Sequence, residues 1–417
     1  MNNGDTAFML ISAALVFIMI PGLAFFYGGL VKKRHVLSIM MQSIAGLGIV
    51  TILWVVIGYT IAFGTDINGL IGGLDYLGLK DVGLDPKGEM TIPHILFVAF
   101  QLMFAILTPA LATGATAERL RFPAYVGILA LWSLVVYAPV AHWVWGGGWL
   151  GSLGALDFAG GTVVHISSGI SGLVAAIVIG KRYNKANDPT IPHNIPYVVL
   201  GGALLWIGWF GFNAGSELAA DGTAALAFAN THIAACMGLL GWMISEKLHH
   251  GKATMLGAIS GAVAGLVGIT PACAFITPLA SIVLGLIVGV VCYFSVAVLK
   301  EKLGYDDALD VFGIHGIGGT IGALMTGIFC TAAVNPLVAN EGLFYSGNFE
   351  QVKIQLIATL ATYAYAAVAT FIILKVVGIF TPLAASNIEQ ETGLDSTQHG
   401  ESAYSDIDGL STSFSNL

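Results

Sequence analysis

The feature that most constrains this chain is a series of long stretches that contain no Asp, Glu, Lys or Arg. A helix that crosses a bilayer needs about 20 consecutive and mostly apolar residues. Ten stretches meet this length, and they are 6–31, 35–65, 90–117, 122–156, 158–180, 189–216, 222–245, 253–299, 311–340 and 354–374. The stretch 253–299 has room for two helices, with a break expected near Pro271 and Pro278, because proline removes a backbone donor and favours a turn. The sequence therefore predicts an all-α polytopic membrane protein with eleven transmembrane helices.

The composition agrees with a membrane protein and argues against several other classes. Hydrophobic residues make up 56% of the 417 residues and charged residues only 10%, whereas soluble domains carry about 25% charged residues. The net charge of −8 argues against a nucleic-acid partner, because such proteins gather Lys and Arg on one face. The four cysteines show no Cys-x-x-Cys spacing, and no glycine-rich phosphate-binding motif occurs. We expect no metal, no cofactor and no enzyme activity.

The basic residues predict the orientation of the chain in the membrane. Loops after odd-numbered helices contain thirteen of the sixteen Lys and Arg residues, and the other three are Lys80, Lys87 and Lys353. Because cytoplasmic loops retain an excess of basic residues, we expect a multi-pass protein of the cytoplasmic (inner) membrane with its N-terminus outside. The transmembrane domain is expected over 1–383. A cytoplasmic regulatory tail follows over 384–417, and its polar, acidic composition predicts a solvated and mobile segment.

An internal repeat is the most informative motif in the sequence. Asp157, His165, Gly169 and Gly172 recur 150 positions later as Asp307, His315, Gly319 and Gly322. Repeats of this kind in transporters often have inverted topology, with a pseudo-twofold axis in the membrane plane. We expect two five-helix inverted repeats, about 6–180 and about 190–340, and an eleventh helix at about 353–383.

The repeat is expected to bring its two histidines together near the bilayer midplane. Ionisable residues inside a bilayer usually mark a pathway, so we interpret His165 and His315 as pore residues. Each aspartate lies eight residues before its histidine, where a carboxylate can cap the N-terminus of a helix. We interpret Asp157 and Asp307 as structural supports of the site. Direct binding of a cation by Asp157 is the alternative.

The remaining histidines are interpreted as structural or solvated. His232, at the start of the helix expected in 222–245, is expected to be a core residue with its hydrogen bonds satisfied. His94 and His142 are expected near helix ends. Solvated positions in loops or the tail are expected for His35, His193, His249, His250 and His399.

The chemistry of the histidine pair narrows the class of solute. Two neutral imidazoles in contact share one hydrogen bond, and burial and a neighbouring cation both disfavour the charged form. No carboxylate lies in the interior of these helices, and the idealised cost of moving an unpaired ion into low permittivity is on the order of 20 kcal/mol. K⁺ or Na⁺ should therefore be stopped, whereas ammonium can release a proton and continue as ammonia.

Aromatic residues near the expected outer helix ends are candidates for a vestibule and a gate. An aromatic face attracts a cation by about 0.5–2 kcal/mol. The candidates are Phe100 and Phe104 in AFQLMFAIL, Trp145 in HWVWGGGW, and Trp209 and Phe212 in WIGWFGFNAGS. Without the histidine pair, such residues are typical of core packing or of interfacial belts.

Several motifs resemble the ammonium transporter (Amt/Mep/Rh) family, in particular its bacterial members. They are DFAGGTVVH (157–165), DDALDVFGIHGIGG (306–319), GWFGFNAGS (208–216) and AERLRF (117–122), and the resemblance extends over nearly the whole chain. Leu309 departs from the pattern, because some members have cysteine there, and Pro109 is a second departure.

The resemblance implies a homotrimer with a pore in each subunit, and it implies roles for several residues. Trp145, Phe104 and Ser216 correspond to an outer ammonium site, Phe104 and Phe212 to a stacked gate, and His165 and His315 to the twin-histidine pair. Phe100 and Trp209 are expected to line the gate and the pore. The segment GLDSTQHGESAY (393–404) is similar to the family's C-terminal stretch, which implies a PII-type signalling protein as a cytoplasmic partner.

The resulting hypothesis is uptake of ammonium and ammonia, with methylammonium as a further candidate. Ammonium is captured in the outer aromatic site, deprotonated and conducted past the histidines, and uptake is electrogenic if the proton follows along the pair. The alternatives are an electroneutral ammonia channel, an ammonium sensor and a membrane haem protein, since paired histidines on transmembrane helices also serve as axial ligands.

Overall fold

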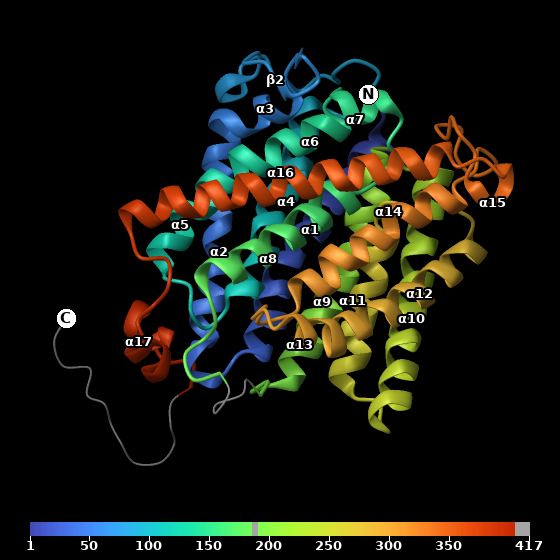
Figure 1. The fold of residues 1–417 in the computed structure, drawn as a ribbon. Coiled ribbons are helices and arrows are strands. Elements are labelled where there is room, and N and C mark those ends of the chain that lie inside the picture. The colour runs from blue at the N-terminus through green and yellow to red at the C-terminus, as the bar shows by residue number, and fades with distance from the viewer. Residues whose placement is uncertain (186–190, 405–417) are drawn as a thin grey trace.

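The computed structural model describes residues 1–185 and 191–404, which form a bundle of helices with one short hairpin (Figure 1). Within these residues ten helical spans are long and apolar enough to cross a membrane, and the shorter apolar helix Met255–Ile269 is the eleventh. The prediction of an all-α protein with eleven transmembrane helices is therefore confirmed.

The spans follow the order expected from the sequence. Their helices are α1 (Asn3–Leu30), α2 (Val36–Leu53) continued by α3 (Tyr59–Phe63), α4 (His94–Thr113), α5 (Phe122–Trp132) continued by α6 (Ala138–Trp145), α8 (Ser167–Ile179), α9 (Ile195–Ala214), α10 (Gly222–His250), α11 (Met255–Ile269), α12 (Pro278–Phe294), α14 (Ile317–Phe329) and α16 (Glu350–Phe380). The short helices are α7 (Trp149–Leu153), α13 (Lys300–Leu303), α15 (Leu343–Ser346) and α17 (Asn387–Thr392). Strands β1 (Asp66–Ile67) and β2 (Ile71–Gly72) pair antiparallel.

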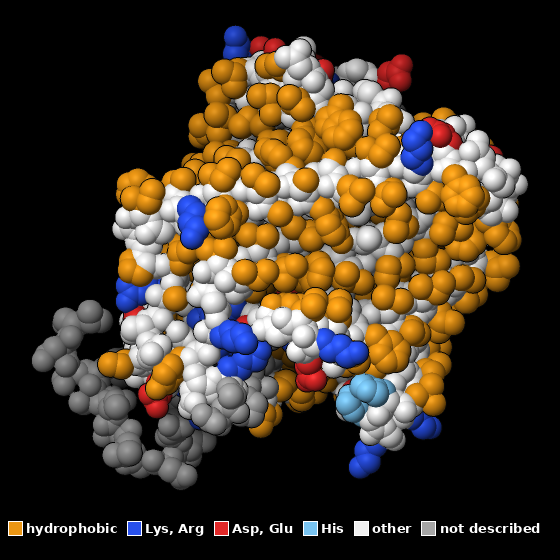
Figure 2. Space-filling view, viewed as in Figure 1, with side chains coloured by type: hydrophobic (Ala, Val, Ile, Leu, Met, Phe, Trp, Pro, Cys, Tyr) orange, Lys and Arg blue, Asp and Glu red, His pale blue; other side chains and the backbone are white. Residues whose placement is uncertain are grey.

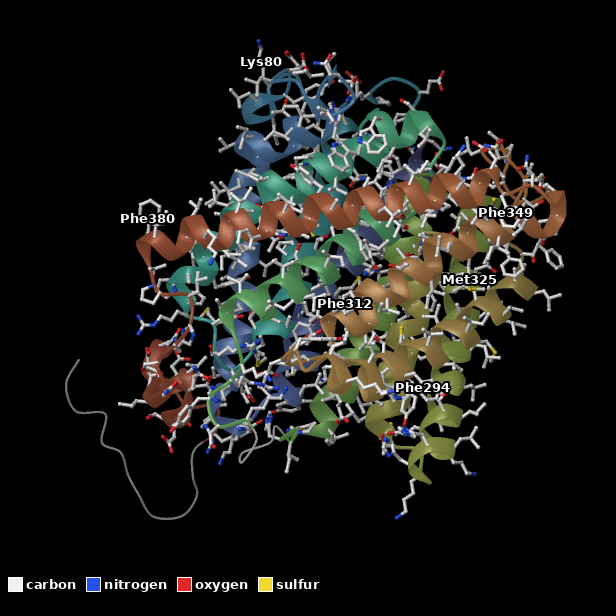
Figure 3. All side chains as sticks on the ribbon, in the orientation of Figure 1. Lys80, Phe294, Phe312, Met325, Phe349 and Phe380 are labelled. Carbon is white, nitrogen blue, oxygen red and sulfur yellow. The ribbon has the colours of Figure 1, made fainter. Side chains whose placement is uncertain are left out.

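The surface of the bundle is suited to lipid. Figure 2 shows hydrophobic side chains across the middle of the visible face, with Lys and Arg mostly toward the end that carries α13 and α17. Phe294, Phe349 and Phe380 extend outward from the surface (Figure 3) and are 44%, 66% and 83% exposed. Exposed apolar side chains in this number are costly in water and favourable in a bilayer.

The first part of two spans is a wide π-helical turn. These turns are η6 (Gly161–Ile166), which leads into α8, and η9 (Phe312–Gly316), which leads into α14. They contain His165 and His315 at matching places of the repeat. Turns of this kind occur often at functional sites.

The two spans that contain α8 and α14 cross at glycines, because each helix packs on the π-helical turn that leads into the other. A Cβ built on Gly169 would lie 2.2 Å from the backbone nitrogen of Gly316, and one on Gly319 would lie 3.0 Å from the Gly161 oxygen and 3.1 Å from the His165 Cβ. Small residues permit such close approach of helices. The two contacts are reciprocal. Gly169 of the first repeat meets the turn that contains His315, and Gly319 of the second repeat meets the turn that contains His165. This is the pattern that a pseudo-twofold axis produces.

The segment after residue 383 differs in part from its prediction as far as residue 404. Glu389 on α17 forms an ion pair with Arg121 at 2.8 Å, and the Ser38 N–H, at the start of α2, donates to the Asp395 carboxylate at 2.8 Å. Tyr404 bonds to His193 at 2.9 Å. A carboxylate at a helix N-terminus is favoured by the unpaired N–H groups and the helix dipole. These contacts hold parts of 384–404 against the bundle, which the composition did not predict, whereas Asn387, Glu391 and Glu401 are exposed as expected. Residues 405–417 lie outside the described residues.

Four histidines also differ from their predictions. His399 is half-buried against Phe122, and its Nε2 atom is shielded from solvent. His35 is buried, at 2% exposed, and accepts a hydrogen bond from the Leu394 N–H. His193 is half-buried and bonds to the Val31 carbonyl. His232 is neither at a helix start nor in the core, because it lies well inside α10, is exposed and packs against Trp206. Charge counting along the chain does not reveal which side of a helix faces lipid.

Candidate functional site

Two of the five predicted aromatic residues, Phe104 and Trp145, line a pocket of about 450 Å³. Phe104 on α4, Trp145 at the end of α6 and Ser216 just after α9 all line it. The other lining residues are Phe63, Lys87, Gly88, Met90, Phe97, Gln101, Gly146, Phe158 and Leu218. The pocket has the size of a small-molecule site and is mostly apolar with a few polar groups.

The pocket is built to present aromatic faces and one hydroxyl oxygen. The ring centroids of Phe104 and Trp145 are 6.1 Å apart with an interplanar angle of 88°. The Trp145 Nε1–H donates to the Asp157 backbone carbonyl at 2.8 Å, which fixes the indole. The Ser216 hydroxyl donates to the Phe212 carbonyl at 2.8 Å. Its oxygen therefore keeps lone pairs that can accept an N–H from a cation in the pocket.

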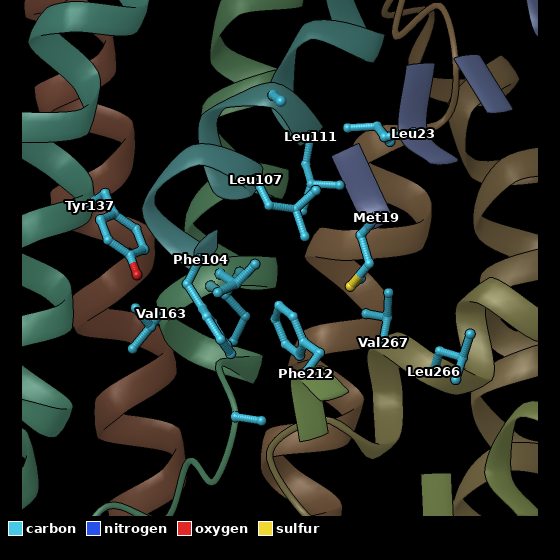
Figure 4. Close-up of a cluster of buried hydrophobic side chains, with 14 of the residues drawn as sticks. Met19, Leu23, Phe104, Leu107, Leu111, Tyr137, Val163, Phe212, Leu266 and Val267 are labelled. Carbon is cyan, nitrogen blue, oxygen red and sulfur yellow. The ribbon is translucent and has the colours of Figure 1, made fainter. Parts of the chain in front are cut away.

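Two stacked phenylalanine rings lie where the pocket ends. The ring centroids of Phe104 and Phe212 are 4.2 Å apart with an angle of 25°, and Figure 4 shows the two rings side by side between their helices. Both side chains are at most 1% exposed. Phe100 lies outside the pocket lining and packs edge to face on Phe104 at 4.9 Å. The two rings of the stack are therefore shielded from solvent, and Phe100 packs against Phe104.

The two repeated histidines are in direct contact behind this stack. Their Nδ1 atoms are 3.2 Å apart, and their rings are inclined by 19°. One nitrogen can donate and the other accept, so a single proton joins two neutral rings. The His165 Nε2 atom is buried and has no hydrogen-bond partner. An unpaired buried nitrogen of this kind is costly unless a passing molecule can bond to it.

Trp209 holds the first histidine in place. Its indole stacks on His165 with centroids 5.4 Å apart and an angle of 22°. The Trp209 Nε1–H donates to the Thr270 hydroxyl at 2.9 Å, which joins α9 to the end of α11. The predicted aromatic residues and histidines thus form a chain of ring contacts. It runs from Trp145 through Phe104 and Phe212 to His165 and His315.

A narrow cavity of about 10 Å³ accompanies the histidine pair. This volume holds about one water-sized molecule. Its lining residues are Met19, Leu23, Phe26, Tyr27, Leu107, Leu111, His165, Leu205, Trp209, Val263, Leu309, Ile314 and His315, and none of them is Asp, Glu, Lys or Arg. Leu309 also lines a larger pocket of about 680 Å³ beside Lys181, Lys300 and Asp310. A wide pocket at one end, a one-molecule segment and a second wide pocket therefore follow one another.

The two aspartates of the repeat act as helix caps. The Asp157 carboxylate accepts the N–H groups of Gly160, Gly161, Thr162 and Val163 at 2.6–3.1 Å. The Asp307 carboxylate accepts those of Val311 and Phe312 at 3.1 and 2.7 Å. Asp157 is 6% exposed and is absent from the pocket lining. In this conformation both carboxylates hold the histidine turns and do not face the pocket.

A buried ion-pair cluster that the sequence did not predict lies next to Asp307, the cap of the second histidine turn. Arg182 bonds to Asp306 at 2.8 Å and to Glu118 at 3.1 Å, and all three are nearly buried. Burial alone raises the pKa of Asp306, but the bonds from Arg182 outweigh it and hold this pKa below its usual range. The three partners lie far apart in the sequence, so no local pattern predicts their contact.

Other lining residues were missed for a similar reason. Phe63 is the last residue of α3, and Lys87 and Met90 come from the connection that follows it, which carries no repeat and no motif. Gln101 lies one residue after Phe100 in a stretch that was already singled out. The one feature of the sequence that indicates a role for Gln101 is its polar side chain in an otherwise apolar helix.

Comparisons with known proteins agree with this geometry. The model of the Ammonium Transporter Family matches residues 7–404. The ammonium transporter of Bacillus subtilis is 56% identical over 407 residues, which are 97% of this chain and 100% of the relative. The crystal structure of Candida albicans Mep2 matches with a TM-score of 0.87 at 36% identity, over 93% of this chain and 88% of that chain. A protein described as a sensor Amt protein matches with a TM-score of 0.87 at 29% identity, over 94% and 97% of the two chains.

The fold defines a multi-pass membrane protein, and its pockets lie on both sides of the histidine pair. The comparisons make the class specific: the chain belongs to the ammonium transporter family, a family of transport proteins and not of enzymes. The resemblance found in its sequence motifs is confirmed.

Proposed function

We propose that this protein takes up ammonium by capturing the cation in the outer aromatic pocket and passing ammonia along the histidine pair. The observation that carries the proposal is the one-molecule segment beside His165 and His315, which contains no full charge and lies between two wider pockets. An ammonium ion in the outer pocket would contact the rings of Phe104 and Trp145 and the Ser216 oxygen. It would enter the narrow segment after losing its proton.

The contact between the histidines supports movement of the proton along the same route. A hydrogen bond between two Nδ1 atoms at 3.2 Å is short enough for transfer between the rings. If the proton follows this path, uptake is electrogenic. If the proton returns to the outside, the protein is an electroneutral ammonia channel.

The orientation in the cytoplasmic membrane is part of the proposal. The aromatic pocket lies on the side of the loops that contain Lys80 and Lys87, and the tail helix α17 lies at the end rich in Lys and Arg (Figure 2). The excess of basic residues supports a cytoplasmic position for that end. We further propose a homotrimer, regulation through the segment 384–417 and docking of a PII-type protein on the cytoplasmic face. The motif at 393–404 supports this partner.

Current measurements on proteoliposomes test the proposal. At fixed pH, an ammonium gradient should evoke current in vesicles with the protein and none in empty vesicles. Uptake without current would leave the electroneutral channel, and the absence of both would refute transport.

A pair of histidine variants tests the pore. His165→Ala should admit K⁺. The packed imidazole of the wild type leaves no room and no partner for a hydrated cation, and the substitution removes it. His232→Ala is the matched control, since this histidine is exposed on α10 and does not line the narrow cavity. Exclusion of K⁺ by the His165 variant, with ammonium still carried, would contradict the role of the pair.

Two other functions receive different support. The likeness to a protein described as a sensor Amt protein favours sensing as a second candidate. Failure of the chain to restore growth of a transport-deficient strain on low ammonium would favour it. The geometry opposes a haem protein, because two Nδ1 atoms at 3.2 Å and a cavity of about 10 Å³ leave no space for a macrocycle between the rings.

A further inference from the structure

The outer pocket already contains a cation that belongs to the chain. Lys87 is the basic residue among the residues that line the pocket, beside Phe104, Trp145 and Ser216. Its side chain is half-buried, although Lys80 in the same connection is exposed. The Lys87 ammonium donates to the Phe63 carbonyl at 3.1 Å and lies 4.4 Å from the centroid of the Tyr76 ring.

The contacts of this ammonium are of the kind that the pocket offers to its substrate. A carbonyl oxygen and an aromatic face hold the Lys87 head group, and a hydroxyl oxygen and aromatic faces are available deeper in the pocket. The tethered cation and a free ammonium ion therefore have matching chemistry. Phe63 belongs to both environments. Its carbonyl accepts the hydrogen bond from Lys87, and the residue also lines the pocket.

The charge of Lys87 is only partly compensated by its surroundings. Among the described residues no carboxylate forms an ion pair with it. The Lys87 charge interacts electrostatically with the Asp75 carboxylate. This carboxylate also accepts a hydrogen bond from the Thr65 backbone N–H. Asp85 and Glu89, on either side in the sequence, are exposed. A positive charge therefore remains at the mouth, where a second cation has to enter.

We propose that the fixed charge of Lys87 sets the concentration of ammonium needed to fill the outer pocket. The inference rests on the proposed uptake of ammonium through this pocket. Like charges repel, so Lys87 lowers the occupancy of the pocket by any cation at low ionic strength. Salt weakens this effect, since the Debye length falls from about 30 Å at 0.01 M to about 3 Å at 1 M.

Three variants separate charge from shape. Lys87→Met removes the charge and keeps an unbranched apolar stem, whereas Lys87→Arg keeps the charge. Lys80→Met is the matched control, because Lys80 lies in the same connection (Figure 3) but does not line the pocket. Initial rates of ammonium uptake into proteoliposomes give KM and kcat at about 0.01 M and about 1 M NaCl.

The expected result is a selective change in KM. Lys87→Met should lower KM by about two- to tenfold at low salt, for charges on the order of 10 Å apart across the pocket. At high salt the KM values of Lys87→Met and the wild type should become equal. The kcat of Lys87→Met should stay within about twofold of the wild-type value. Lys87→Arg and Lys80→Met should have the KM and kcat of the wild type. Equal KM values for the Met and Arg variants at low salt would overturn the inference. So would a difference that high salt leaves unchanged, because it would show an effect of shape.

A second readout separates this inference from the proposed function. Ammonium binding to the detergent-solubilised protein can be followed by tryptophan fluorescence, since Trp145 lines the pocket. If the wild type carries no ammonium, the proposed uptake fails, and the half-saturating ammonium concentration in this titration still decides the role of Lys87. If uptake is normal and no readout distinguishes Lys87→Met from Lys87→Arg, only the inference on Lys87 fails.

Discussion

Replacing Asp157 by Asn should destabilise this protein more than replacing Asp307 by Asn. The two aspartates hold equivalent places in the repeat but differ in how many N–H groups they cap. Each oxygen of the Asp157 carboxylate accepts two N–H groups. Each oxygen of the Asp307 carboxylate accepts one. Asparagine keeps one of the two oxygens and replaces the other by an NH₂ group, which cannot accept a hydrogen bond from an N–H.

The magnitude follows from the number of donors that lose their acceptor. Whichever way the amide turns, Asp157→Asn leaves two backbone N–H groups unpaired and Asp307→Asn leaves one. A hydrogen bond to a charged group contributes about 1.5–3 kcal/mol. The expected cost is therefore about 3–6 kcal/mol for the first variant and about 1.5–3 kcal/mol for the second.

The assay is the thermal midpoint of unfolding of both variants and the wild type in the same detergent, combined with KM for ammonium uptake. The midpoint should fall in the order wild type, Asp307→Asn, Asp157→Asn. KM of the Asp157 variant should change little, because the backbone carbonyl that holds Trp145 is retained. Equal midpoints for the two variants would refute the capping argument. A large rise in KM with an unchanged midpoint would instead show that Asp157 binds the cation directly.

Two further predictions concern the tail and the glycine crossing. The hydrogen bond from Arg121 lowers the pKa of Glu389 from 4.5 to about 2, so this ion pair stabilises the docked tail fully above about pH 4.5 and the contribution is lost as the pH falls toward 2. Glu389→Gln should speed hydrogen exchange of residues 385–404 at pH 7, and a protected tail in this variant would argue against the role of the pair. Gly169→Ala should destabilise the protein by at least about 1–3 kcal/mol, because its Cβ would meet the Gly316 backbone at 2.2 Å. Gly48→Ala, where nothing lies within 4 Å of the added Cβ, is the control, and equal thermal midpoints for these two variants would contradict the prediction.

Much of the fold could be predicted because a membrane removes alternatives. Without water, every backbone group must be paired within a helix, so a long stretch without charges has one regular solution. The break between α11 and α12 falls between Ile269 and Pro278, as the prolines predicted. The pairing of His165 and His315 followed from symmetry, because an offset of 150 residues relates whole helices and so fixes which turns meet.

The parts that could not be predicted depend on contacts between distant segments without a shared motif. Arg182 and Asp306 are 124 residues apart and form a buried pair. The tail reads as solvated by composition, yet Asp395 caps a helix that begins some 360 positions earlier in the chain. In both cases a charged residue pairs with a group that comes close only in the folded chain. The composition of a single segment does not contain this information.

The positions of the charges explain how a pathway of this size could select its solute. A segment of about 10 Å³ has room for ammonia and equally for water or a bare K⁺ ion, so size alone cannot decide. Charged groups lie only outside it, with Lys87 at the outer pocket and the pair of Arg182 and Asp306 near the inner one. A K⁺ ion in the segment would have no carboxylate to replace its water, and burying an unpaired charge costs several kcal/mol even after the protein relaxes. Ammonium avoids this cost by losing a proton before it enters the segment, so in the proposed pathway selection depends on the acidity of the solute.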